Sequence, residues 1–146
     1  MKFAHLVDVN DFVNWCDYLG TLAFAISGIR LAAGKGLDWF GAYVVGFVTA
    51  VGGGTIRDIL LDIKPFWLVQ PSYLIITALG LIFTIIFRRQ VVRLNHSLFV
   101  FDAIGLGLFV VVGVAKSYAA GFPWWVAVIM GTVTGSFGGL LRDVLI

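Results

Sequence analysis

Long apolar stretches separated by short polar segments dominate the hydropathy pattern of the chain. A helix that crosses the hydrocarbon core of a bilayer needs about 20 predominantly apolar residues, and five stretches approach this length. They are Tyr18–Ala33, Trp39–Leu60, Pro71–Phe87, Leu98–Ala115 and the stretch from Pro123 to the chain end. Residues 1–18 hold five Lys, His and Asp side chains and lack the apolar core of a signal peptide. They are predicted to form a short interfacial lead-in to an all-α, polytopic membrane protein.

Composition supports this interpretation and excludes a water-soluble domain. Hydrophobic residues make up 60% of the chain and charged residues 12%, with a mean hydropathy of +1.01, whereas soluble domains carry about 25% charged residues. The net charge of +2 and the scattered basic residues do not indicate a nucleic-acid partner. Cys16 is the one cysteine, so neither an internal disulfide nor a cysteine-based metal site is expected.

Loop charges predict the orientation in the membrane, because Lys and Arg concentrate on the cytoplasmic side. With five spans, one side holds Arg30, Lys35, Arg88, Arg89, Arg93 and Arg142, and the other holds Lys2, Arg57, Lys64 and Lys116. The larger basic group predicts an N-terminus outside a cell inner membrane. The cluster at residues 88–93 fits a topology anchor, with anionic lipid binding as a second option.

The chain contains an internal repeat at an offset of 142 − 57 = 85 residues. Gly53-Gly54-Thr-Ile-Arg57-Asp58 recurs as Gly138-Gly139-Leu-Leu-Arg142-Asp143, and further pairs match at the same offset without a gap. These further pairs are Asp17 with Asp102, Gly20 with Gly105, Phe24 with Phe109, Gly28 with Gly113, Gly36 with Gly121, Trp39 with Trp124 and Gly46 with Gly131.

The first copy, residues 1–96, holds three predicted helices, and the second, residues 97–146, holds two. A unit with an odd number of spans starts its second copy on the opposite side of the membrane, so the copies are expected to be inverted. Inverted repeats place ion and substrate paths between the copies, near broken helices. The counterpart of the third helix would follow Ile146, so the chain is either a piece of a longer protein or an incomplete version of the design.

Glycine clusters interrupt the second and fifth predicted helices. The first cluster is Gly52, Gly53 and Gly54, and the second is Gly135, Gly138 and Gly139. Glycine costs about 1 kcal/mol relative to alanine inside a helix, which favours a bend or an unwound turn whose carbonyls could face a cation. The alternative is close helix packing through small residues. Hydroxyl groups of Thr49, Thr55, Thr132, Thr134 and Ser136 lie on the same two helices.

Charged residues within or beside the apolar helices are candidates for function, because ionisable groups at membrane depth are costly. Arg57 with Asp58, and Arg142 with Asp143, are sequence neighbours that project about 100° apart on a helix, so each is expected to find a partner on another helix. Asp17 and Asp102 are the predicted partners of the arginines. The alternative is that these charges only fix helix ends.

Lys116 has no basic repeat mate, since its counterpart is Leu31. This asymmetry suggests gating or contact with a lipid head group, against the alternative of an interfacial lysine that extends its charge to water. No nucleophile motif, phosphate-binding loop or dinucleotide fingerprint is present, and no metal site or cofactor is predicted. An enzyme is therefore not expected.

The two Gly-Gly-x-x-Arg-Asp motifs, together with the segments that begin at Asp17 and Asp102, resemble the prokaryotic TRIC (trimeric intracellular cation) channels. Bacterial relatives of that family are also labelled glycine-transporter-domain proteins. The resemblance implies seven helices, a homotrimer, and a pore in each subunit that is lined by glycine-bent helices two and five and passes potassium and sodium. Helices six and seven are absent from this chain. A secondary transporter of a small solute such as glycine, and a membrane scaffold without transport, remain as alternative interpretations.

Overall fold

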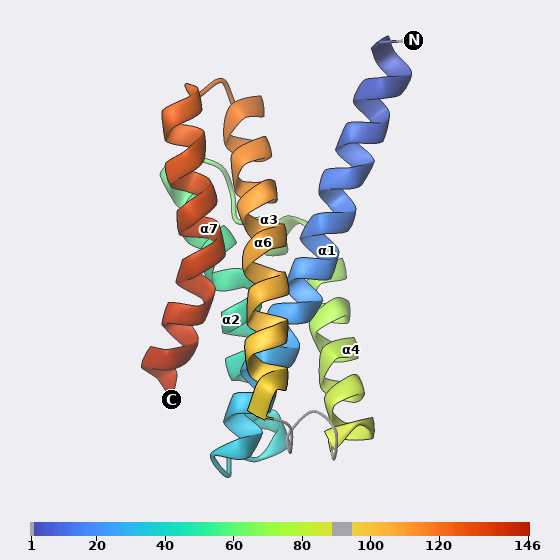
Figure 1. The fold of residues 1–146 in the computed structure, drawn as a ribbon, viewed down its shortest axis with the longest axis vertical. Coiled ribbons are helices and arrows are strands. Elements are labelled where there is room, and N and C mark those ends of the chain that lie inside the picture. The colour runs from blue at the N-terminus through green and yellow to red at the C-terminus, as the bar shows by residue number, and fades with distance from the viewer. Residues whose placement is uncertain (1, 89–94) are drawn as a thin grey trace.

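The computed structural model describes residues 2–88 and 95–146, and these residues are helical apart from short connections (Figure 1). The helices are α1 (Lys2–Gly34), α2 (Trp39–Leu60), α3 (Phe66–Val69), α4 (Ser72–Ile86), α6 (Asn95–Ala119) and α7 (Trp124–Leu145). The prediction of an all-α, polytopic fold is confirmed. The predicted helix boundaries hold best for α2, whose first turn is capped by Asp38, which accepts a hydrogen bond from the Gly41 N–H.

The predicted lead-in at residues 1–18 is wrong as a separate element. Helix α1 begins at Lys2 and continues without interruption to Gly34. Residues 2–19 contain neither glycine nor proline, so nothing in the backbone stops a helix there. The short helix α3, which follows Pro65, was not predicted.

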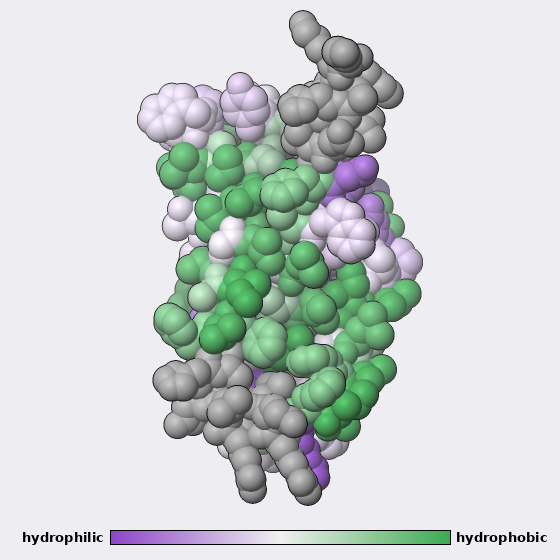
Figure 2. Space-filling model, turned by 45° about the vertical axis from the view of Figure 1, so that its right-hand side comes forward, coloured by the Kyte–Doolittle hydropathy of each residue, from purple (hydrophilic) through white to green (hydrophobic). Residues whose placement is uncertain are grey.

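Three of the described helices are long and apolar enough to cross a membrane, namely α2, residues 99–119 of α6, and α7. Helix α4 is shorter, at 15 residues. Helix α1 packs against α2, α4 and α6, so protein rather than lipid surrounds much of it. Figure 2 shows apolar residues over most of the described surface of one face, as expected of a protein whose solvent is lipid.

Corresponding helices of the two copies run in opposite directions (Figure 1). Helix α1 descends in this view and α6 ascends beside it, while α2 ascends and α7 descends. The turns that follow α1 and α6 match as well. Gly36 and Gly121, an offset-85 pair, have positive φ angles of 86° and 93°, a conformation that glycine adopts without steric cost.

Close contacts between the copies are reciprocal. A Cβ atom at Gly20 would lie 2.9 Å from the Phe109 ring, and one at Gly105 would lie 2.5 Å from the Phe24 ring. Gly20 pairs with Gly105, and Phe24 with Phe109, at the offset of 85. A contact whose symmetry mate is also present is the signature of a two-fold relation. Helices α1 and α6 therefore cross around a pseudo-two-fold axis.

The crossing of α2 and α7 repeats this pattern at the glycine clusters. A Cβ atom at Gly53 would lie 2.1 Å from the Thr134 carbonyl oxygen, and one at Gly138 would lie 2.3 Å from the Thr49 carbonyl oxygen. No side chain fits at either position without displacing backbone. Helix α2 is continuous through residues 52–54, so an unwound turn there is wrong. The contacts show close packing, the alternative, and a bend at these glycines stays a prediction.

Candidate functional site

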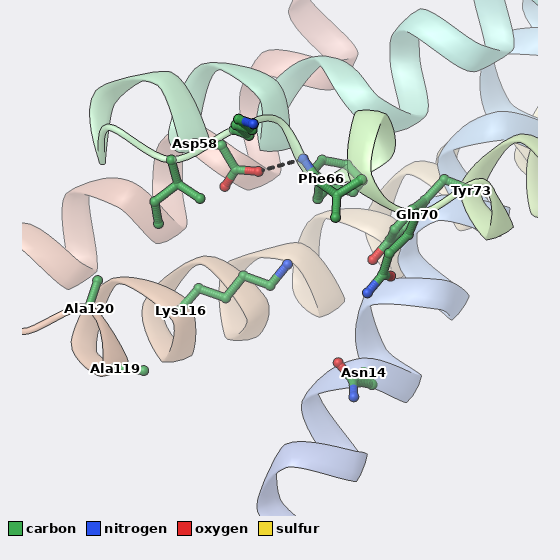
Figure 3. Close-up of a pocket in the computed structure, with 11 residues that line it drawn as sticks. Asn14, Asp58, Phe66, Gln70, Tyr73, Lys116, Ala119 and Ala120 are labelled. Atoms are coloured by element: carbon green, nitrogen blue, oxygen red, sulfur yellow. Dashed lines mark hydrogen bonds between the residues drawn. The ribbon is translucent and has the colours of Figure 1, made fainter.

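The larger of two polar pockets lies where α1, α2, α4 and α6 meet the segment that contains α3. Its cavity volume is about 510 Å³. The polar residues that line it are Asn14, Asp58, Lys64, Gln70, Tyr73 and Lys116. Figure 3 shows Lys116 on one side of this pocket and Gln70 and Tyr73 on another, with Asn14 on α1. We refer to it as the upper pocket, because α3, whose segment lines it, lies in the upper half of Figure 1.

Asp17 is the buried anchor beside the upper pocket. Its Oδ2 atom accepts a hydrogen bond from the Tyr73 hydroxyl and lies 3.3 Å from the Lys116 Nζ atom. The Lys116 ammonium also stands over the Phe66 ring, 5.3 Å from its centroid, a favourable cation–π arrangement. The predicted pairing of Asp17 with an arginine is therefore wrong. Lys116, for which gating, lipid contact or an interfacial position was expected, pairs with a carboxylate of the fold, and those roles stay predictions.

Arg57 and Asp58 pair with each other, contrary to the expectation that sequence neighbours cannot. The Arg57 Nε–H donates to Asp58 Oδ1 at 2.8 Å, because the long guanidinium arm bends back across the last turn of α2. Asp58 Oδ2 in turn accepts from the Phe66 N–H at 3.0 Å, the bond drawn in Figure 3. Arg57 is 1% exposed. Its Nη2 atom lies 2.8 Å from Asp58 Oδ1 but has no partner in hydrogen-bonding geometry among the described residues.

Arg142 makes contacts to two other helices as well as to its neighbour. Its Nη1 atom donates to Asp102 Oδ1 on α6 at 2.9 Å and to Ser27 Oγ on α1 at 2.7 Å. Its Nε atom donates to Asp143 Oδ1 at 3.0 Å. The predicted pairing of Arg142 with Asp102 is present, and Ser27 is a partner that sequence analysis did not identify.

The smaller polar pocket, which we call the lower pocket, lies beside Arg142 and has a volume of about 240 Å³. The residues that form it include Phe24, Asp102, Gly135, Ser136, Gly139 and Asp143. Asp102 and Lys116 lie 14 residues apart on α6, or about 21 Å along the helix at a rise of 1.5 Å per residue. The two pockets are therefore near opposite ends of the same seam between helices.

The predicted hydroxyl groups differ in how far they are exposed. Thr49 and Thr134 are buried and donate to the carbonyl oxygens of Val45 and Met130, one turn earlier in their helices. Their hydrogen-bonding capacity is thus used locally. Thr55 donates to the Val51 carbonyl and accepts from the Trp67 indole N–H.

The other two hydroxyl groups lie towards the outside of α7. Thr132 and Ser136 are exposed, and Ser136 forms part of the lower pocket while donating to the Thr132 carbonyl.

Phe66 and Tyr73 are the site residues that sequence analysis missed. Phe66 fills the space above Gly54, where an added Cβ atom would lie 2.3 Å from its ring, and its centroid is 4.4 Å from that of Tyr73. Pro65 and Pro71 bracket this segment and could have indicated a structured turn. The predicted topology anchor at Arg89 and Arg93 lies outside the described residues.

Comparison with known proteins gives consistent matches. A family described as "Glycine transporter" matches residues 14–89 and 99–146. The chain is 48% identical over 135 residues to the UPF0126 inner membrane protein YadS of Escherichia coli (strain K12), covering 91% of this chain and 65% of YadS. It thus spans about two thirds of the length of that curated relative.

Solved structures agree with the fold. The chain is similar to the TRIC trimeric intracellular cation channel orthologue from Rhodobacter sphaeroides, with a TM-score of 0.86 and 36% identity over 91% of this chain and 69% of that one. It is also similar to a prokaryotic TRIC channel crystallised in 0.5 M KCl, with a TM-score of 0.83 and 34% identity, over the same shares of the two chains.

Proposed function

The chain belongs to the TRIC family, matched as "Glycine transporter", and from that premise we propose that it forms the conducting part of a channel for monovalent cations. The path runs within one subunit, along the seam of α1, α2, α6 and α7, and passes potassium and sodium. The similar proteins of known structure are described as cation channels.

The observation that carries this proposal is the pair of polar pockets near opposite ends of one seam. The upper pocket has carboxylate, amide and hydroxyl groups, and the lower pocket has Asp102, Asp143 and Ser136. The carboxylates of Asp17, Asp58 and Asp102 are each paired with a basic side chain. Little uncompensated negative charge is left to bind an ion tightly, which suits weak, rapid passage of monovalent cations rather than retention of divalent ones.

Assembly and placement follow the same proposal. We expect a homotrimer with one pore per subunit, in contact with membrane lipid, in a cell inner membrane. The N-terminus is outside and the Arg30, Lys35 and Arg88 end faces the cytoplasm, in keeping with the positive-inside rule. The glycine clusters of α2 and α7 serve as the positions at which these two helices part when the pore opens.

Uptake of a small solute such as glycine is the second candidate function, favoured by the description of the matching family. Inverted repeats serve alternating-access transporters as well as channels. The pockets of the described residues, at about 510 and 240 Å³, could each hold a molecule of that size.

Planar-bilayer recording of the purified protein separates the two functions. Discrete single-channel currents in symmetrical potassium chloride, with a reversal potential that follows the potassium gradient, support the channel. Silent bilayers combined with saturable glycine uptake into proteoliposomes contradict it and support the transporter.

A further inference from the structure

A buried apolar cluster adjoins both polar pockets, because its Phe24 lines the lower pocket and Phe66, which packs against the cluster, lines the upper one. Phe24, Ala25, Ala50, Val51 and Phe109 pack together, and each is at most 5% exposed. The rings of Phe24 and Phe109 meet edge to face with centroids 5.1 Å apart. None of these side chains carries a hydrogen-bonding atom, so a cation that enters this cluster would lose its water without gaining a ligand.

The phenylalanine pair straddles the pseudo-two-fold axis. Phe24 and Phe109 are repeat mates, and a residue that touches its own symmetry mate must lie at the axis. Gly20 and Gly105 supply the space for the two rings, each receiving the ring of the other copy. Because the axis relates the inverted copies, the pair lies near the middle of the path between the pockets.

Val51 distinguishes the two sides of this cluster. Its repeat mate is Ser136, which forms part of the lower pocket, whereas Val51 is 5% exposed within the apolar cluster. The same position in the fold is thus polar and accessible in one copy, and apolar and closed in the other.

We propose that Phe24, Phe109 and Val51 form an apolar gate that closes the path by excluding water, as hydrophobic constrictions do in other channels. This inference rests on the proposed channel function. It identifies the position at which the path is closed and the apolar side chains that close it. The structure describes the closed state, and conduction requires the two rings to part so that water connects the pockets.

Val51→Ser tests the gate with a side chain that the fold already accepts at the repeat-related position. Val45→Ser is the matched control, since Val45 lies on the same helix, is also 5% exposed, and packs in a separate cluster with Ile29, Ala32 and Ala42. We expect Val51→Ser to raise the open probability in potassium about tenfold, equivalent to ~1.4 kcal/mol in the free-energy difference between the closed and open states, and Val45→Ser to leave it unchanged. Equal open probabilities in the two variants would overturn the gate while leaving the channel function in place.

Thiol accessibility tests the barrier independently of any current. In a Cys16→Ser background, Val51→Cys and Ser136→Cys place a thiol at the two repeat-related positions. We expect a membrane-impermeant thiol reagent to modify position 136 readily and position 51 far more slowly. Similar rates at both positions contradict a water-excluding gate, even if the protein proves to transport glycine rather than conduct potassium.

Discussion

The two Arg-Asp motifs have nearly the same sequence but different surroundings. Arg57 is buried and, among the described residues, donates to its neighbour Asp58, whose second oxygen accepts from the Phe66 N–H. Arg142 reaches across to Asp102 and Ser27, and the side chain of Asp143 is 62% exposed. The first motif is therefore closed over by an aromatic ring, and the second borders an open pocket.

This difference in surroundings shows that the segments packed beside an Arg-Asp motif, and not the motif's own sequence, determine which contacts its side chains make. The segment that follows α2 folds back so that Phe66 covers Gly54, whereas the space beside Gly139 is part of the lower pocket. Two substitutions between the copies complete the contrast, since Ser27 has Val112 as its mate and Lys116 has Leu31. Lys116 pairs with Asp17, whereas the equivalent carboxylate of the second copy, Asp102, pairs with Arg142.

Removal of the two equivalent carboxylates should give the largest contrast. Asp17→Ala leaves the Tyr73 hydroxyl and the Lys116 ammonium without their buried acceptor, and we expect a loss of about 3 kcal/mol in the free energy of unfolding, since breaking a buried pair costs ~3–5 kcal/mol. Asp102→Ala should cost about 1 kcal/mol, because the Asp102 side chain is 39% exposed and Arg142 keeps Asp143 and Ser27. Unfolding by sodium dodecyl sulfate titration in mixed micelles measures both values.

Lys116→Met provides the control for the first variant. It removes the ion pair but keeps the Tyr73 hydroxyl bonded to Asp17, so its cost should lie between those of Asp17→Ala and Asp102→Ala. Equal losses for Asp17→Ala and Asp102→Ala would show that the two carboxylates are equivalent in spite of their different partners.

Alanine at the last glycine of each cluster should have opposite effects on stability. Gly54→Ala places a Cβ atom 2.3 Å from the Phe66 ring, and the displaced ring would pull on the N–H that binds Asp58. We expect a loss of about 2 kcal/mol, within the range of overpacked cores. At Gly139 the nearest atom, Asp102 Oδ1, is 3.6 Å away, so Gly139→Ala should be neutral or stabilising by up to about 1 kcal/mol. The same titration measures both variants. Destabilisation by both would contradict the view that a side chain covers Gly54 but not Gly139.

Features that follow from periodicity and repetition could be predicted from the sequence. Hydropathy placed the apolar helices. Of Asp17 and Asp102, the two carboxylates expected to bind the arginines, Asp102 does bind Arg142. Predictions from the sequence failed where the outcome depends on which residues are neighbours in three dimensions. The glycines of α2 predict either a bend or close packing from sequence alone, and the choice depends on a partner helix whose Thr134 carbonyl comes within reach of Gly53.

Contacts made by the segment after α2 were beyond sequence analysis for the same reason. Phe66 is an ordinary aromatic residue in an apolar chain, and nothing local indicates that its N–H caps Asp58 or that its ring lies beneath both Arg57 and Lys116. The Arg57–Asp58 bond also defied the rule for adjacent helical residues, because it forms in the last turn, where a long side chain can bend back.

The smallest expected effect concerns the Nη2 atom of Arg57, which has no hydrogen-bond partner in the part of the chain that the structure describes. Ser27 accepts a hydrogen bond from Arg142 Nη1, and its mate Val112 is fully buried. The two-fold relation therefore places a serine at position 112 beside the Arg57 guanidinium, whose Nη2 atom has no hydrogen-bond partner among the described residues. Val112→Ser should therefore cost about 1 kcal/mol less than Val45→Ser, since a new hydrogen bond to a charged group offsets part of the lost apolar burial. This advantage should vanish in an Arg57→Met background, where no donor remains. If Val112→Ser and Val45→Ser are equally destabilising with Arg57 in place, the pseudo-symmetry of the helices does not extend to the guanidinium groups, and the two motifs differ in geometry as well as in their neighbours.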